Sequence, residues 1–141
     1  MNESELDALR SMLRIGLQWD TQVTLDACEH TLTQAYCSAL PVAYLYHADY
    51  LWAAFAQLVL EASYEATLYA ALLNFAKTGN NKVYLTLLGG GAFGNNLTWI
   101  LAAMQRAFSL FKTVPLDVAI VSYRQSIPPV SSLVNNFSSG Y

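Results

Sequence analysis

The segment KVYLTLLGGGAFGNNLTWILAAMQRAF, residues 82–108, decides the fold expected for this chain. Its first part is an apolar run with β-branched and aromatic members, which is typical of a buried strand. Three glycines follow, and from Thr98 to Lys112 the apolar residues recur at helical spacing. A second apolar run at 116–123, LDVAIVSY, predicts another buried strand. Strand, glycine loop, helix and strand in this order indicate an α/β fold with parallel strands.

Three consecutive glycines between a strand and a helix are difficult to explain by folding alone. Each glycine costs backbone entropy and contributes no side-chain packing. A glycine run is useful where backbone N–H groups must approach a ligand, and the following helix adds unpaired N–H groups and the positive end of its dipole. Gly89 to Gly94 therefore predict a loop that binds phosphate without a basic side chain. The alternative interpretation is a tight turn with no ligand.

Gly89, Gly91 and Gly94 also match the GxGxxG pattern of Rossmann dinucleotide-binding domains. Such domains hold the ribose with an acidic residue at the end of the next strand, about 20 residues further on. Here the only acid in the next strand, Asp117, stands at its start. A nicotinamide-dinucleotide domain is therefore the least favoured interpretation.

The remaining sequence predicts one domain, residues 1–125, followed by an irregular polar tail at 126–141. Helical spacing of apolar residues predicts helices at 3–19 and 49–76, and a run rich in Val, Tyr, Thr and Leu predicts a buried strand at 32–46. Together with the two strands on either side of the glycine loop, this strand gives an expected sheet of about three strands.

Composition narrows the classes of protein to which the chain can belong. Apolar residues make up 55% of the sequence and charged residues 12%, which excludes intrinsic disorder and a charge-rich coiled coil. A net charge of −3 argues against the basic face that a non-specific nucleic-acid-binding protein needs. The longest apolar stretch, 50–76, is interrupted by polar and acidic residues and is not expected to cross a membrane.

The N-terminus, the cysteines and the histidines give expectations about location and cofactors. The acidic start MNESELDALR lacks the basic and apolar regions of a signal peptide, so we expect a cytoplasmic protein with reduced thiols. Cys28 and Cys37 form no CxxC pair, and His30 and His47 are isolated. Neither a metal site nor another cofactor is expected.

Residues 85–108, together with LDVAIVSY, resemble the second half of macro domains, the ADP-ribose-binding superfamily that includes poly(ADP-ribose) glycohydrolases. The sequence is most similar to a divergent branch known from bacterial effector-type proteins. Three upstream segments fit the same branch: GLQWDTQV at 16–23, YCSALPVAY at 36–44 and LVLEASYEATL at 58–68.

This resemblance covers residues 10–125 and implies a macro-domain-like three-layer sandwich. A macro domain has further strands and an earlier loop with its own Asn and glycines, whereas residues 1–30 contain only Gly16. The resemblance therefore implies a sandwich that lacks the usual N-terminal strands and is truncated to about three strands with flanking helices.

The resemblance further implies that the ligand is ADP-ribose, free or attached to a protein. In that family the equivalent loop encloses the diphosphate. The residues implied to bind it are Gly89, Gly90, Gly91 and Ala92 through their N–H groups, Phe93 against the distal ribose, and Gly94 and Asn95, which close the turn. From the residues alone, Phe93 either covers a ligand or fills the core beside Trp99.

Two carboxylates are candidates for acid–base catalysis. Glu61 and Glu65 lie four residues apart on an otherwise apolar helix, where a buried carboxylate needs a partner. We favour Glu65, in YEATL, as the one that faces the ligand, and the alternative is a solvated edge or a stripe covered by a partner. Asp20 is the second candidate because the resemblance includes its segment, and its alternative role is a cap. Tyr64 and Thr67 are assigned to packing.

These observations predict a protein that binds ADP-ribose or ADP-ribosyl groups. They leave open whether it is also an enzyme that hydrolyses the ribosyl bond, which would need a carboxylate to protonate the leaving group or activate a water. The alternative is a non-catalytic interaction or oligomerisation module derived from a macro domain. A short sheet would leave an apolar face or strand edge uncovered, so we expect a homo-oligomer. No nucleic-acid or membrane partner is expected.

Overall fold

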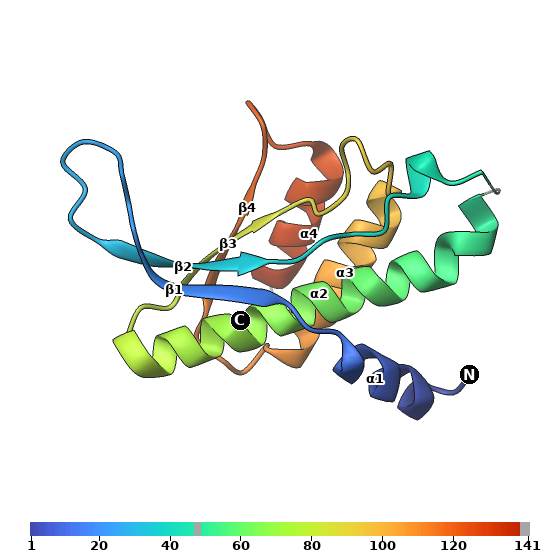
Figure 1. The fold of residues 1–141 in the computed structure, drawn as a ribbon, viewed down its shortest axis with the longest axis horizontal. Coiled ribbons are helices and arrows are strands. Elements are labelled where there is room, and N and C mark those ends of the chain that lie inside the picture. The colour runs from blue at the N-terminus through green and yellow to red at the C-terminus, as the bar shows by residue number, and fades with distance from the viewer. Residues whose placement is uncertain (47–48, 139–141) are drawn as a thin grey trace.

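The computed structural model describes residues 1–46 and 49–138 and shows a mixed α/β protein, as the sequence predicts. Its elements in chain order are α1 (Glu3–Met12), β1 (Gly16–Gln22), β2 (Thr31–Tyr36), the 3-10 turn η1 (Val42–Tyr44), α2 (Asp49–Thr78), β3 (Lys82–Thr86), α3 (Leu97–Leu110), β4 (Asp117–Val121) and α4 (Pro128–Ser138). The long helix α2 extends across the molecule, and the other elements are arranged around it (Figure 1).

The four strands form two separate two-stranded sheets. β3 and β4 are parallel and in register from Lys82 opposite Asp117 to Thr86 opposite Val121, with α3 in the connection between them. β1 and β2 form an antiparallel pair. These two sheets replace the single sheet of about three parallel strands expected from the sequence. The finer expectation, a macro-domain-like sandwich, is not confirmed.

The helix predicted at 3–19 ends at Met12, and Gly16 begins β1 instead. α1 starts with a capping box, in which the Asn2 side chain accepts from the N–H of Glu5 and the Glu5 side chain accepts from the N–H of Asn2. Beyond α1 the chain pairs with β2, and this pairing overrides the helical spacing of the apolar residues.

The strand predicted at 32–46 is also shorter than expected, because β2 ends at Tyr36 and η1 follows Pro41. Proline donates no backbone hydrogen bond and cannot continue a ladder. The helices predicted at 49–76 and 98–112 correspond to α2 and α3. Residues 37–41 and the turn η1 therefore form a loop, whose position is important for the candidate site.

Residues 128–138, which the sequence places in an irregular polar tail, form α4. Val130, Leu133 and Phe137 recur at helical spacing; Val130 and Leu133 are buried, and the Phe137 ring packs against an aromatic ring of α3. These apolar side chains form a buried stripe along α4. The many Ser and Asn residues of the same segment make this stripe difficult to recognise in the sequence. Residues 139–141 lie outside the described residues.

The main core lies between α2, α3, α4 and the inner face of the β3–β4 sheet. Val83 and Leu85 of β3 point into it. The largest fully buried apolar side chains are Leu60, Leu68, Ile100, Met104 and Val130. Each contributes roughly 1.5–3 kcal/mol by burial. The glycine loop therefore begins and ends on elements held firmly by this core.

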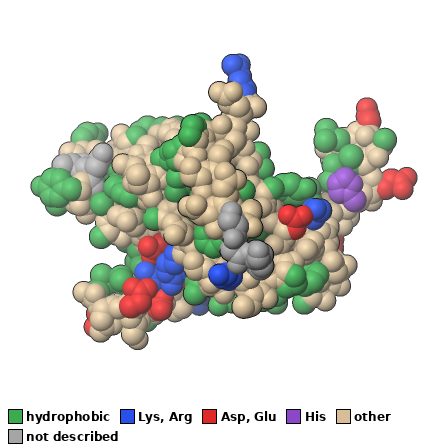
Figure 2. All heavy atoms as spheres, turned by 180° about the vertical axis from the view of Figure 1, so that it is seen from behind, with side chains coloured by type: hydrophobic (Ala, Val, Ile, Leu, Met, Phe, Trp, Pro, Cys, Tyr) green, Lys and Arg blue, Asp and Glu red, His purple; other side chains and the backbone are tan. Residues whose placement is uncertain are grey.

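The outer face of the parallel sheet is largely uncovered. Tyr84 is 69% exposed and Val121 is 51% exposed, although parallel strands usually have both faces covered. The association expected from the sequence stays a prediction, and it would depend on apolar surface of this kind. Seen from behind, one group of acidic and basic side chains lies at the lower left, others are spread over the face, and apolar side chains form separate patches (Figure 2). In the residues that the structure describes, no helix has the length and apolar character needed to cross a membrane.

Candidate functional site

The glycine loop between β3 and α3 is shaped by close contact with a second segment of the chain. Gly89 and Gly94 have φ angles of 73° and 68°, in the left-handed region that favours glycine. A Cβ atom at Gly89 would lie 2.4 Å from the Cβ of Ala39, and one at Gly94 would lie 2.8 Å from the Cβ of Ala43. The two glycines are required because another backbone lies against the loop.

This second segment, residues 38–44, follows β2 and runs beside the glycine loop (Figure 1). The N–H of Ala43 donates to the carbonyl of Phe93 over 3.0 Å, and Nδ2 of Asn95 donates to the carbonyl of Leu40 over 2.8 Å. The absence of a second loop was inferred from residues 1–30 alone, so residues 38–44 were not recognised as one from the sequence. The available signal was Pro41, which ends a strand and so begins a loop.

Tyr64 of α2 holds the start of the glycine loop through two hydrogen bonds. Its buried hydroxyl donates to the carbonyl of Thr86 over 2.8 Å and accepts from the N–H of Leu88 over 2.9 Å. Burial raises the pKa of this hydroxyl above its ordinary value, so it stays protonated and able to donate. The side chain assigned to packing from the sequence therefore also fixes the point where β3 turns into the loop.

The top of the loop presents backbone donors to solvent. Gly90, Gly91 and Ala92 are exposed, and a Cβ atom at Gly91 would meet nothing within 4 Å. Across the ranges 1–46 and 49–138, no acceptor is found for the N–H groups of Gly91, Ala92 and Phe93. Three consecutive unpaired N–H groups ahead of a helix N-terminus can bind an anion.

Asn95 joins the glycine loop to residues 38–44 through Nδ2, and its Oδ1 is an acceptor without a donor among the described residues. The residue is 5% exposed, and its Nδ2 donates to Leu40 and also lies 3.4 Å from the carbonyl of Gly89. Its Oδ1 is buried, and no hydrogen-bond donor for it is found in the described part of the chain. Buried acceptors are normally paired, so this oxygen has unmet capacity for an O–H or N–H donor.

Phe93 makes the core contact that was one of the two alternatives from the sequence, and its contact with a ligand stays a prediction. It is half-buried and packs on the main core, to which Trp99 also contributes. Its ring also meets the ring of Tyr44 at an interplanar angle of 81°, with centroids 6.3 Å apart. Phe93 thus joins the glycine loop to residues 38–44 as well as to the core.

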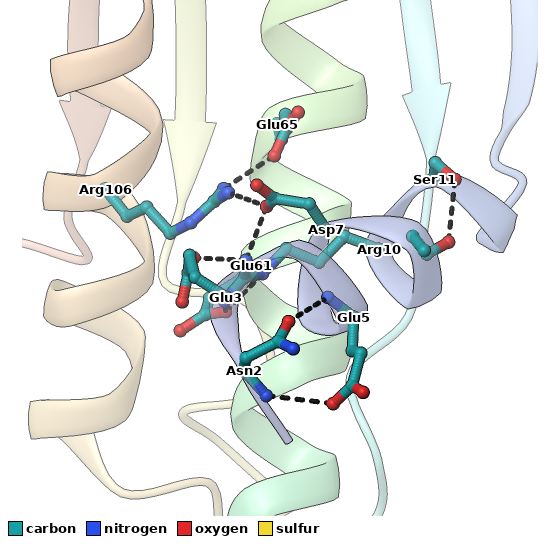
Figure 3. Close-up of polar contacts among 10 residues, drawn as sticks. Asn2, Glu3, Glu5, Asp7, Arg10, Ser11, Glu61, Glu65 and Arg106 are labelled. Atoms are coloured by element: carbon teal, nitrogen blue, oxygen red, sulfur yellow. Dashed lines mark hydrogen bonds and ion pairs between the residues drawn. The ribbon is translucent and has the colours of Figure 1, made fainter.

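The candidate acid Glu65 lies in a cluster of ion pairs rather than against the glycine loop (Figure 3). Arg106 of α3 donates to Glu65 over 2.6 Å and to Asp7 of α1 over 2.7 Å. Arg10, which is 8% exposed, pairs with Asp7 and Glu61, and Glu3 completes the cluster. We refer to Glu3, Asp7, Arg10, Glu61, Glu65 and Arg106 as the α1 cluster.

The α1 cluster neutralises charges that would be costly if left alone. Burial opposes the charge of Arg10, but hydrogen bonds to Glu3, Asp7 and Glu61 outweigh it and raise the pKa of the guanidinium above its ordinary value. Glu61 and Glu65 were expected at a ligand, at a solvated edge or under a partner. The structure instead pairs each of them with an arginine.

Asp20, the second candidate acid, lies at a different end of the molecule. Its carboxylate accepts from Nζ of Lys77 over 2.9 Å, and both side chains are exposed. Lys77 belongs to the last turn of α2, whereas residues 38–44 precede the first turn of that helix. Of the residues predicted for the site, Gly89–Asn95 therefore lie together in one loop. Glu65 and Asp20 each form an ion pair in another part of the molecule.

Metal chemistry and thiol chemistry receive no support from the described residues. No group of three or more His, Cys, Asp or Glu side chains suited to a metal ion occurs among them. Cys37 is partly buried, and burial raises the pKa of its thiol, which makes it a weak nucleophile. His47 lies outside the described residues.

Two hollows of the surface are lined by no residue of the glycine loop. One of about 280 Å³ is bounded by α2, α3, β4 and α4, and another of about 670 Å³ contains Arg10, Glu65 and Arg106 of the α1 cluster.

Comparison of the chain with protein-family models, with curated proteins and with solved structures finds no match.

Proposed function

We propose that the chain is a binding module for ADP-ribose or an ADP-ribosyl group, with the diphosphate against the glycine loop. The observation that supports this most directly is the run of three N–H groups without an acceptor among the described residues, at the exposed Gly91 and Ala92 and the half-buried Phe93. They lie at the carboxyl end of a parallel strand and just before α3, where anionic ligands of α/β proteins are generally held.

The electrostatics near the loop support an anionic ligand. Residues 66–116, which include β3, the loop and α3, contain no Asp or Glu. The N-terminus of α3 adds the positive end of a helix dipole. Asn95 Oδ1 adds an acceptor that could pair with a ligand hydroxyl after a small shift, which suits a ribose better than a bare phosphate.

The hydrolysis considered from the sequence has less support than the binding of ADP-ribose. An acid catalyst must reach the bond that it cleaves, and both candidate carboxylates are engaged by cations away from the loop. Our proposal is therefore binding without an assigned catalytic residue. Glu65→Gln is expected to leave the affinity for ADP-ribose unchanged.

Calorimetric titration with ADP-ribose tests the proposal. Gly91→Glu places a carboxylate where the structure has open space, so the fold should survive while the new charge repels the diphosphate from the N–H groups of the loop. Hydrogen bonds to charged groups contribute about 1.5–3 kcal/mol each, so loss of two should weaken binding by about a hundredfold or more. Gln105→Glu, on an exposed position of α3, adds the same charge outside the loop and should bind normally.

Two results would contradict the proposal. One is a wild-type protein that shows no binding of ADP-ribose at millimolar concentration. The other is a folded Gly91→Glu variant, verified by circular dichroism, that retains the wild-type affinity.

A further inference from the structure

The two strands of the parallel sheet each have a free edge. Along a strand of such a ladder, residues alternate between bonding to the neighbouring strand and pointing their N–H and C=O groups away from it. The N–H of Asp117 donates to the carbonyl of Asn81, so every second residue of β4, beginning with Asp117, bonds to β3. The backbone groups of Val118 and Ile120 therefore point to the free edge of β4.

The free edge of β4 is open, whereas that of β3 is partly occupied. At both ends of β3 the outward backbone groups are bonded to side chains, those of Asn80 and Tyr64. For the backbone of Val118 and Ile120, no donor or acceptor is found in the part of the chain that the structure describes. Residues 118–121 also have no proline, no charged side chain and no shift of register, which are the features that normally protect an edge from a further strand.

The charges that flank this edge favour the same segment of a second copy as its partner. Asp117 precedes the uncharged residues 118–123, and Arg124 follows them. The carboxylate of Asp117 pairs with Lys82 but stays more than half exposed, and the guanidinium of Arg124 lies over the ring of Tyr123. Antiparallel pairing of two identical segments brings the acidic end of each copy to the basic end of the other, whereas parallel pairing would place like charges together.

We propose that β4 pairs antiparallel with β4 of a second copy of the chain and so joins two β3–β4 sheets into one sheet of four strands. Outward backbone groups must meet outward groups, and the register that pairs most of them places Ile120 opposite Ile120 of the second copy and Val118 opposite Ser122. Each contact then occurs twice about a two-fold axis, which is the usual symmetry of a homodimer. The inference does not depend on the ligand, because β4 contains no residue of the glycine loop.

Amide hydrogen exchange tests this pairing in the unmodified chain. At low protein concentration the Ile120 amide should exchange quickly because it lacks an acceptor, while the Ala119 amide, which donates to β3, should exchange slowly. At a concentration where sedimentation equilibrium shows dimers, the Ile120 amide should become protected, and the Ala119 amide should remain slow.

Ser122→Pro tests the backbone bonds directly. It removes one outward donor from each copy and leaves the bonds between β3 and β4 in place. The loss of two backbone bonds should weaken dimerisation by about five- to a hundredfold in sedimentation equilibrium. Ser122→Ala is the matched control, because it keeps the N–H and removes only a buried hydroxyl that has no partner among the described residues.

Arg124→Glu tests the charges at the two ends of the paired strands. It places like charges beside Asp117 of the second copy and should weaken dimerisation by about two- to tenfold. Arg14→Glu changes the net charge by the same amount and should leave dimerisation unchanged, since Arg14 lies on the connection between α1 and β1 and donates only to backbone carbonyls.

Three results would overturn the proposal. The first is a chain that stays monomeric at millimolar concentration, whether or not it captures an extended peptide. The second is a dimer in which the Ile120 amide exchanges as quickly as in the monomer, because the copies would then meet through another surface. The third is a folded Ser122→Pro variant that dimerises as tightly as Ser122→Ala, and if Ser122→Pro does not fold, hydrogen exchange in the unmodified chain still decides.

Discussion

Tyr64 and Glu65 are neighbours in α2, yet they belong to two regions built on different principles. The hydroxyl of Tyr64 bonds to the backbone where β3 enters the glycine loop. The carboxylate of Glu65, about 100° further around the helix, joins the α1 cluster through Arg106. The loop region uses backbone groups and uncharged side chains, whereas the cluster consists entirely of ionised side chains.

The difference shows which groups remain available for a ligand. In the α1 cluster, opposite charges are paired with one another, so its carboxylates are committed to holding α1 against α2 and α3. In the loop, close contact with residues 38–44 fixes the backbone while N–H groups at its top stay unpaired. A region without a single charged side chain is thus the better candidate for binding a charged ligand.

The largest effect on stability is expected from Gly89→Ala, which tests whether close backbone contact builds the loop. Its new Cβ would lie 2.4 Å from Ala39 in a left-handed conformation, so strain and overlap should together cost about 3 kcal/mol of unfolding free energy. Urea denaturation measures this cost. Gly79→Ala is the control, because Gly79 has a φ of 75° but no atom within 4 Å of its would-be Cβ and should lose only about 1 kcal/mol. Equal losses in the two variants would show that the contact with Ala39 is unimportant.

A smaller effect is expected from Arg10→Met, which removes the central cation of the α1 cluster. Glu61 then loses its arginine in a partly buried position, and because its surroundings are partly solvated the cost should be about 2 kcal/mol rather than the full penalty of a buried pair. The same denaturation experiment measures it, and affinity for ADP-ribose should stay unchanged. Arg14→Met should cost less than about 0.5 kcal/mol, since Arg14 donates only to backbone carbonyls at the surface. A loss of ligand affinity in Arg10→Met would contradict the separation of the two regions.

The smallest effect on stability is expected from Tyr64→Phe, about 1 kcal/mol for the hydroxyl that bonds Thr86 and Leu88. Hydrogen exchange at the Leu88 amide should accelerate, because that amide loses one of its two acceptors and keeps only the carbonyl of Thr86. Tyr69→Phe is the control on the same helix, since Tyr69 is 53% exposed and its ring contacts Phe111. Unchanged exchange at Leu88 would remove Tyr64 from its positioning role.

The same variant has a predictable pH dependence. The pKa of Tyr64 is raised in the folded protein, so its contribution to stability is complete below the unfolded pKa of about 10 and is lost as pH rises above that value. The stability difference between wild type and Tyr64→Phe should therefore shrink in alkaline solution. A difference that stays constant from neutral pH to about pH 11 would contradict burial as the cause of the shift.

The sequence predicted those parts of the molecule whose signals are local. Val83 and Leu85 alternate with exposed residues in β3, glycines end that strand, and apolar spacing marks α3, so the order of elements in this half was correct. Local spacing failed for β1, because only pairing with β2 distinguishes a strand from a continued helix there. It failed for α4 because a short apolar stripe is set among Ser and Asn residues.

The candidate site was predictable as a loop but not as a surface. The glycines identified the segment that forms the loop. The contact between Ala39 and Gly89 produces no recognisable sequence pattern, because it depends on two small residues that lie far apart in the chain. The roles of Glu65 and Asp20 could not be predicted either. Their cations, Arg106 and Lys77, are 41 and 57 residues away and are brought near only by the fold.

The hydrogen bond between Asn95 and Leu40 has a consequence for folding kinetics. The two residues are 55 positions apart in the chain, and α2 and β3 lie between them. Contacts of such separation form slowly, because the entropy of closing a long loop must be lost before they stabilise anything. We therefore expect the contact between residues 38–44 and the glycine loop to form late in folding, so a partly folded chain would present the glycines without the geometry that lets them bind a ligand.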